Sequence, residues 1–232
     1  MYQCDQLLLK RLVPERLIVN QLLKINKGHF MEEYIGTIPL ENRLPIIDYL
    51  NESILPHMII NPQGAAKGRC QLWIQTAPPL MATTPWHVGY EDERIMNYVR
   101  SIAPEGFTPE AVLVTKGGNI RRHRDARYAD YRGMSINLGK VTWYYERSND
   151  QYFWQPGVAE SVPAGRYDLT GGEVFMFNTK NPHWVEDAHP DRWSFNVWQI
   201  SKNTRSDYNK FMEQRANGTL TQEQLNYKVA GY

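Results

Sequence analysis

The sequence has little cysteine and almost no imbalance of charge. Its two cysteines, Cys4 and Cys70, form no closely spaced pair, so neither a disulfide framework nor a cysteine-based metal site is expected. On the same ground we expect a reducing, cytoplasmic environment. The 26 Lys and Arg residues nearly balance the 25 Asp and Glu residues, for a formal net charge of +1. Bulk electrostatics therefore gives no indication of a nucleic-acid-binding protein.

Long apolar runs, internal repeats and low-complexity tracts are also missing. No segment approaches the apolar length needed to span a bilayer, so we expect no membrane partner. The first residues lack a basic stretch followed by an apolar run, so we expect no signal peptide. The 232 residues, 42% hydrophobic and 22% charged, are typical of a soluble globular protein with one large domain or a core with a helical annex.

The local pattern changes near residue 106. Before it, apolar residues at helical spacing predict helices at 17–25, 42–54 and 91–102. We therefore expect residues 1–105 to form a mostly helical N-terminal region that packs on the core. Beyond the core, helical patterns return and predict a helical C-terminal tail at 202–232 that packs on the core or on a partner.

Residues 106–201 have the pattern of a β-rich core. Short β-like runs alternate with turns rich in Gly, Pro and Asn, which is typical of a sandwich or jelly roll rather than a parallel sheet. The expected fold class is mainly β with flanking helices, that is α+β. The predicted strands lie at 111–115, 134–138, 141–145, 167–170, 173–178, 183–186 and 194–200.

A charged stretch of the core region, I-R-R-H-R-D-A-R-Y-A-D, contains a candidate pair of metal ligands. In extended backbone, residues i and i+2 project to the same side, so His123 and Asp125 could reach one metal ion. Taken alone, the pair is more typical of a solvated loop. The four arginines of the stretch are expected to form a solvated rim, or alternatively to attract an anionic substrate.

A third ligand would complete a set of two histidines and one carboxylate, which leaves three adjacent positions open on octahedral iron. His183 is the preferred candidate, because it begins a short extended segment directly after a hydrophobic strand and a polar turn. His189 is the rival, but it stands in the loop E-D-A-H-P-D. Arg192 precedes another predicted strand and could pair bidentately with a carboxylate, although most arginines are ordinary surface residues. Arg132 is a second candidate for an anionic ligand or for a structural salt bridge.

The ordered set H-x-D, a histidine after G-E-V-F-M-F-N, and R-x-S resembles the iron(II)- and 2-oxoglutarate-dependent oxygenases over residues 111–200. The segments I-x-x-H-x-D, R-G-M-S-I-N-L and N-P-H-W-V-E-D look most like the aspartyl/asparaginyl β-hydroxylase and proline hydroxylase branch. The resemblance implies a double-stranded β-helix, a cupin-like jelly roll, with iron at its mouth. It also implies that His123, Asp125 and His183 are catalytic residues that bind Fe(II).

The resemblance further implies a site for 2-oxoglutarate. Arg192 would bind the far carboxylate of this cosubstrate, with Ser194 assisting. Asn137, at an inward-facing position of the predicted strand M-S-I-N-L, is a further candidate for contact with 2-oxoglutarate. Tryptophans of the core region are expected to fill the core, with one or two lining the pocket.

The expected function is that of a dioxygenase that uses O2 and 2-oxoglutarate to hydroxylate a C–H bond, with release of succinate and CO2. The resemblance favours an amino-acid or peptide side chain as the substrate. A nucleobase is the alternative substrate class, although no basic stripe with interleaved aromatics argues for it. The alternatives are a non-catalytic cupin-like binding protein and a structural or assembly protein. Cupins usually carry H-x-H with a glutamate close behind, which this sequence lacks. The oligomeric state is not predicted.

Overall fold

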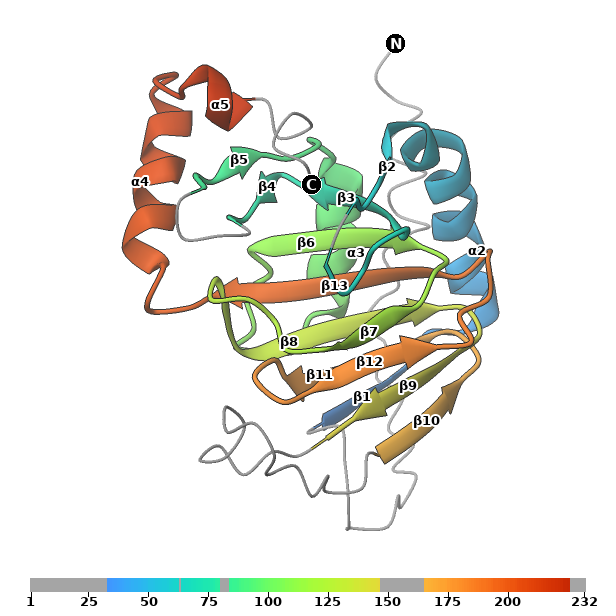
Figure 1. Ribbon diagram of the computed structural model, residues 1–232. Helices are drawn as coiled ribbons and strands as arrows, with labels where there is room; N and C mark the ends of the chain where they lie inside the picture. Colours follow the sequence, from blue (N-terminus) through green and yellow to red (C-terminus); the bar gives the residue numbers. More distant parts are fainter. Residues whose placement is uncertain (1–32, 63, 80–83, 147–164, 226–232) are drawn as a thin grey trace.

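Two antiparallel β-sheets form the core of the protein (Figure 1). The computed structural model describes residues 33–62, 64–79, 84–146 and 165–225. The predicted helix at 17–25 lies outside these residues. The strands of the larger sheet are β1 (Glu33–Thr37), β2 (Ile59–Ile60), β3 (Cys70–Ile74), β6 (Ala111–Lys116), β8 (Ala129–Leu138), β11 (Glu173–Asn178) and β13 (Trp193–Ile200). The strands of the smaller sheet are β7 (Ile120–His123), β9 (Val141–Tyr145), β10 (Gly165–Leu169) and β12 (His183–Glu186).

The strand order is β1-β11-β8-β13-β6-β3-β2 in the larger sheet and β10-β9-β12-β7 in the smaller one. Apolar residues of β9, β10 and β12 pack against Phe175 and Phe177 of β11, so the two sheets face each other. All the strands predicted between residues 106 and 201 are present, and the two facing antiparallel sheets form the expected double-stranded β-helix. β8 begins at Ala129 rather than at Met134, because its exposed first half, with Tyr131 and Arg132, lacks the apolar alternation that signals a strand.

Alternation along the strands gives the larger sheet two different faces. One face is apolar and packs under helices, with Leu72, Val114, Phe195 and Ile136 as members from four adjacent strands. The opposite face, called the polar face, faces the smaller sheet and carries polar side chains beside aromatic ones such as Trp73 and Phe175. Because antiparallel Cα partners project to the same side, one row across the four strands consists of buried polar residues. These are Gln71, Thr115, Ser194 and Asn137.

Helices cover the apolar face. They are α2 (Leu40–Tyr49), the π-helical turn η1 (Leu50–Ile54), the 3-10 turn η2 (Leu55–His57) and α3 (Glu93–Ile102). The helices predicted at 42–54 and 91–102 are therefore present. The carboxylate of Asp92 caps α3 by accepting a hydrogen bond from the Ile95 N–H at 2.8 Å. It also accepts a hydrogen bond from the hydroxyl of Tyr49 at 2.6 Å, which ties α3 to α2.

The described part of the N-terminal region contains strands as well as the predicted helices. β1 pairs with β11 and β3 pairs with β6, so both belong to the larger sheet. Two further short strands, β4 (Thr76–Ala77) and β5 (His87–Val88), form a sheet of their own. The strand β3 lacks polar alternation because Leu72 and Ile74 face the helices while Trp73 faces the other sheet, so both sides are buried. The boundary at residue 105 stays a prediction.

The described part of the C-terminal tail, to residue 225, contains the helices α4 (Arg205–Ala216) and α5 (Gln222–Leu225). Tyr208 and Phe211 of α4 pack on Trp86, with ring centroids 5.0 and 6.4 Å from that of the indole. Trp86 is buried, so it belongs to this contact between the tail and the rest of the protein. Within the part of the chain that the structure describes, no helix is both long and apolar enough to cross a membrane.

Candidate active site

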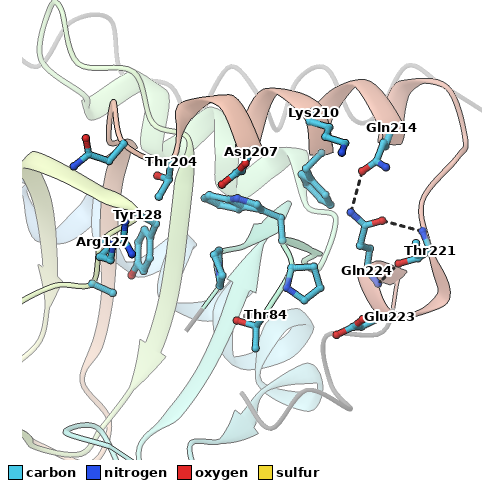
Figure 2. Close-up of a pocket in the computed structure, with 16 residues that line it drawn as sticks. Thr84, Arg127, Tyr128, Thr204, Asp207, Lys210, Gln214, Thr221, Glu223 and Gln224 are labelled. Carbon is cyan, nitrogen blue, oxygen red and sulfur yellow. Dashed lines mark hydrogen bonds between the residues drawn. The ribbon is translucent and has the colours of Figure 1, made fainter. Parts of the chain in front are cut away.

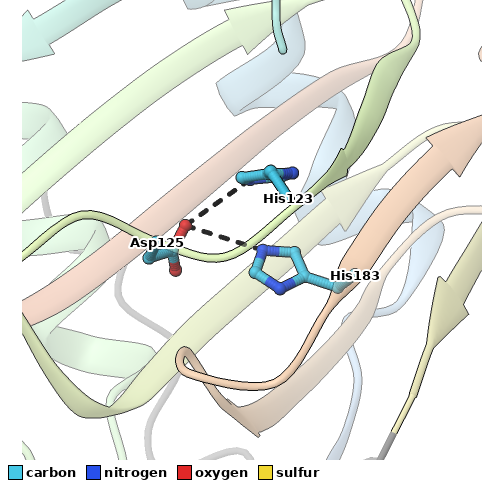
Figure 3. A group of neighbouring side chains, drawn as sticks. All are labelled: His123, Asp125 and His183. Carbon is cyan, nitrogen blue, oxygen red and sulfur yellow. Dashed lines mark ion pairs between the residues drawn. The ribbon is translucent and has the colours of Figure 1, made fainter. Parts of the chain in front are cut away.

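His123, Asp125 and His183 converge at one end of the space between the sheets (Figure 3). His123 ends β7 and His183 begins β12, and the two are Cα partners in the antiparallel pair. Asp125 follows β7 by two residues, and its N–H donates to the carbonyl of Thr179 at 3.0 Å. Oδ1 of Asp125 lies 3.6 Å from Nε2 of each histidine. The three potential ligand atoms all lie within 4.8 Å of one another.

Backbone carbonyls determine which nitrogen of each histidine faces the aspartate. Nδ1 of His123 lies 2.9 Å from the carbonyl oxygen of Arg121, and Nδ1 of His183 lies 2.9 Å from that of Asn181. A carbonyl oxygen only accepts hydrogen bonds, so each Nδ1 carries the proton and each Nε2 presents its lone pair. In the neutral form of both rings, two lone pairs and a carboxylate oxygen therefore face a common position. This donor set fits a divalent metal ion.

The carboxylate of Asp125 is held from its other side. Its Oδ2 accepts a hydrogen bond from the indole N–H of Trp198 at 2.8 Å, which leaves Oδ1 toward the histidines. Burial raises the pKa of Asp125, but His183 and His123, through the charge and the N–H groups of their protonated rings, outweigh burial and hold this pKa well below its usual range. The carboxylate is therefore ionised and available as a ligand.

A cavity of about 490 Å³ lies between the sheets, and the three residues line it. Its apolar walls come from aromatic side chains of both sheets, including Trp73, Trp143, Phe177 and Trp198. One or two tryptophans of the core region were expected to line the pocket, and Trp143 and Trp198 do so. The polar wall includes Arg69, Gln71, Ser135, Arg192 and Asn196. One cavity thus joins a candidate metal site to buried hydrogen-bond donors.

Arg192 lines this cavity, where its guanidinium group could bind an anionic ligand. Its side chain is buried, and its Nε donates to Oδ1 of Asn137 at 2.7 Å. Its Nη1 is buried and has no hydrogen-bond partner among the described residues. Burial and the neighbouring Arg69 lower the pKa of Arg192 to about 9, while Glu173 opposes the shift. An anionic ligand would supply both the missing acceptor and a compensating charge.

Ser194 and Asn137 are fully buried behind the polar wall and do not line the cavity. Asn137 contacts Arg192, while the Ser194 hydroxyl contacts Arg69 at 3.2 Å and Thr115 at 2.7 Å. The structure therefore places both residues where they support arginines. Direct contact of either with 2-oxoglutarate stays a prediction.

The rival residues lie elsewhere. His189 is in a turn with its side chain 56% exposed, and its Nδ1 accepts a hydrogen bond from the N–H of Asp191. Arg132 forms a surface ion pair with Glu33 at 3.2 Å. The arginines near His123 are not a uniform rim, because Arg124 lines the cavity and Arg122 pairs with Glu146.

Several polar residues of the cavity were not identified from the sequence, above all Arg69 and Gln71. They come from the segment R-C-Q-L-W-I, in the region that was expected to be helical. The available signal was a spacing of two between Arg69, Gln71 and Trp73, which lets all three project to one side of an extended strand. The apolar run of Leu72, Trp73 and Ile74 conceals this alternation.

A second cavity, of about 600 Å³, is lined in part by residues of the tail helices (Figure 2). It lies between the tail helices and the segment that follows Asp125, and both cavities are lined by Ala126 and Tyr128. Gln224 of α5 bonds to Gln214 of α4 and to Thr221, which holds the two helices around this cavity. The second cavity therefore borders the segment that carries the candidate metal ligand.

No protein-family model matches the chain, and no curated protein sequence is similar to it. Solved structures do match. The structure of OsALKBH1 is 14% identical and covers 70% of this chain and 94% of its own, with a TM-score of 0.49. A 2OG-Fe(II) oxygenase family oxidoreductase from Burkholderia pseudomallei is 14% identical, covers 67% and 77% of the two chains and has a TM-score of 0.40.

A prolyl hydroxylase from Trichoplax adhaerens, solved in complex with a hypoxia inducible factor peptide fragment, is also 14% identical. It covers 70% of this chain and 78% of its own, with a TM-score of 0.42. At these identities the likeness concerns the fold alone. The three side chains His123, Asp125 and His183 form a group that could hold a metal ion.

Proposed function

We propose that the protein is an Fe(II)- and 2-oxoglutarate-dependent dioxygenase that hydroxylates a C–H bond of its substrate. One observation carries the proposal. The lone pairs of two imidazoles and the carboxylate oxygen of Asp125 point at a common position in a cavity that also contains Arg192 with an unpartnered N–H. A solvated charged loop would not require either feature.

The residues present fit the two groups that this activity needs. His123, Asp125 and His183 would hold Fe(II) through three ligands and leave positions open for cosubstrate and oxygen. Arg192 would bind the far carboxylate of 2-oxoglutarate. When bound, iron and 2-oxoglutarate supply the oxidising chemistry, in which O2 is consumed, 2-oxoglutarate yields succinate and CO2, and one oxygen atom enters a C–H bond.

The protein's own residues orient the ligands and exclude water. The carbonyls of Arg121 and Asn181 hold the imidazoles, and Trp198 holds the carboxylate of Asp125. The buried aromatic rings of Trp73 and Trp143 line the cavity and keep water from the reacting position.

We further propose an amino-acid or peptide side chain as the substrate. The second cavity supports this proposal, because it borders the segment after Asp125 and could hold the remainder of such a substrate. Its charged lining residues are Arg127, Asp207, Lys210 and Glu223, two of each sign. A balanced lining suits a zwitterionic or peptide group, whereas a polyanionic nucleic acid would require an excess of positive charge.

The test is succinate formation from 2-oxoglutarate in the presence of Fe(II), O2 and a panel of amino acids and peptides. We expect turnover with the wild type and its loss in His183→Ala and in Asp125→Ala. His189→Ala is the matched control, because it removes an exposed histidine outside the site, and it should retain the wild-type rate. Full turnover in His183→Ala would contradict the assignment of the ligands. Absence of turnover in the wild type would favour the non-catalytic alternatives.

A further inference from the structure

A second buried arginine, Arg69, lies in the cavity with Arg192. It directly precedes β3, and only 5% of its surface is exposed. Its Nη2 donates to the hydroxyl of Thr115 at 2.6 Å and to that of Ser194 at 3.2 Å. Its Nε is buried and has no hydrogen-bond partner among the described residues. Arg69 therefore has the same property as Arg192, a buried donor without an acceptor.

The two arginines belong to one polar network across the larger sheet. Ser194 is the Cα partner of Thr115 on one side and of Asn137 on the other. Arg69 is bonded to the first pair, and Arg192 is bonded to Asn137. Their charges lie close enough that Arg69 contributes to lowering the pKa of Arg192. The row of buried polar residues thus supports two guanidinium groups on the same side of the sheet.

Neither guanidinium is neutralised within the part of the chain that the structure describes, since neither forms an ion pair with a carboxylate there. Glu173, whose charge acts on Arg192, is instead bonded to the amide of Asn137 at 2.8 Å and to the N–H of Gly171 at 2.9 Å. Two buried positive charges without a bonded anion carry a large desolvation cost. The arrangement is that of an anion site.

Two glycines pack closely against these arginines. A Cβ at Gly118 would lie 3.2 Å from Cγ of Arg69, and one at Gly139 would lie 2.8 Å from Cα of Arg192. The turn after β6 therefore packs directly against Arg69, and the turn after β8 packs directly against Arg192. This packing limits the positions open to both guanidinium groups.

We propose that Arg69 is a second cosubstrate-binding residue, and that Arg69 and Arg192 together bind the far carboxylate of 2-oxoglutarate. The inference rests on the proposed function and extends it to specificity. A carboxylate offers about four lone-pair positions on two oxygens, enough for donors from two guanidinium groups. A 2-oxo acid without a second carboxylate leaves both charges uncompensated. The pair therefore selects dicarboxylic over monocarboxylic 2-oxo acids.

The test is calorimetric binding of 2-oxoglutarate and of 2-oxobutyrate to protein loaded with Mn(II), which needs no turnover. The wild type should bind 2-oxoglutarate more tightly. Since a hydrogen bond to a charged group contributes appreciably, Arg69→Met and Arg192→Met should each weaken 2-oxoglutarate binding about 10- to 100-fold. Binding of 2-oxobutyrate should not change. Arg132→Met is the control, because Arg132 pairs with Glu33 at the surface, and it should change neither affinity.

The outcomes separate the inference from the proposed function. If Arg69→Met binds 2-oxoglutarate like the wild type, or weakens both 2-oxo acids equally, Arg69 has only a structural role and the inference is overturned. If the wild type with Mn(II) binds neither 2-oxo acid, the proposed function fails and the inference fails with it. Should Arg69→Met not fold, Arg69→Lys keeps the charge without the planar fork. It should still lose 2-oxoglutarate affinity selectively, and unchanged affinity overturns the proposal.

Discussion

The indole of Trp198 offers a test of how the candidate metal ligands are oriented. Its N–H donates to Oδ2 of Asp125 at 2.8 Å, which leaves Oδ1 at 3.6 Å from both histidines. The ring packs against Trp73 and Tyr128, with centroids 5.6 and 5.7 Å away. Trp198→Phe keeps an aromatic ring in this contact and removes the donor. The perturbation therefore acts mainly on the carboxylate.

The size of the effect follows from the charge and burial of Asp125. A hydrogen bond to a charged group contributes about 1.5–3 kcal/mol, and loss of a group that orients a metal ligand typically costs about 10- to 100-fold in metal affinity. We expect Trp198→Phe to weaken Mn(II) binding by about this factor. The measurement is a titration in which the electron paramagnetic resonance spectrum reports the concentration of free Mn(II). Circular dichroism would establish that the variant is folded.

Trp143→Phe is the matched control, since Trp143 is equally buried in the same cavity and forms no described hydrogen bond to a candidate ligand. It should bind Mn(II) like the wild type. If Trp198→Phe also binds like the wild type, the indole N–H does not orient the carboxylate. If both variants lose affinity equally, the cause is packing of the cavity rather than the hydrogen bond.

Three further predictions concern other contacts. In Gly139→Ala the new Cβ would meet Cα of Arg192 at 2.8 Å, so 2-oxoglutarate affinity measured by calorimetry should fall while Mn(II) affinity does not; equal loss of both would contradict this. Asp92→Ala removes the cap of α3 and the partner of Tyr49, and should lower the free energy of unfolding in urea by about 1–3 kcal/mol, whereas no change would refute the role of the cap. Burial lowers the pKa of His87 from its ordinary value of 6.5, so the unfolded state binds the proton first as pH falls. Below about pH 6.5 the free energy of unfolding in urea should fall more steeply with pH in the wild type than in His87→Gln, by up to about 1.4 kcal/mol per pH unit. The same pH dependence in both proteins would exclude this effect.

The strands of the core region were predictable because their signals are local. In M-S-I-N-L, Ser135 and Asn137 alternate with Met134 and Ile136, and the structure places the first pair on the polar face and the second under the helices. Turns rich in Gly, Asn and Pro separate these runs. Local reasoning also made His123, Asp125 and His183 candidates, from the spacing of two residues between the first pair and from the position of His183 at the start of a predicted strand.

The second arginine was not predictable, because its role depends on contacts far apart in the sequence. Arg69 meets Thr115 and Ser194 only through the register of β3 on β6 and of β6 on β13. Polarity patterns along one strand do not encode the order of strands. The same limit applies to Asn137, whose inward position was predicted from alternation, whereas its place behind Arg192 follows from tertiary packing.

We propose that His123, Asp125 and His183 hold an iron ion to which 2-oxoglutarate binds. The most direct measurement is an anaerobic titration of the purified protein with Fe(II) and 2-oxoglutarate, recording the weak visible charge-transfer band of the chelate. We predict a band in the wild type and none in Asp125→Ala. A folded wild-type protein that develops no band, or an Asp125→Ala variant with an undiminished band, would contradict the account.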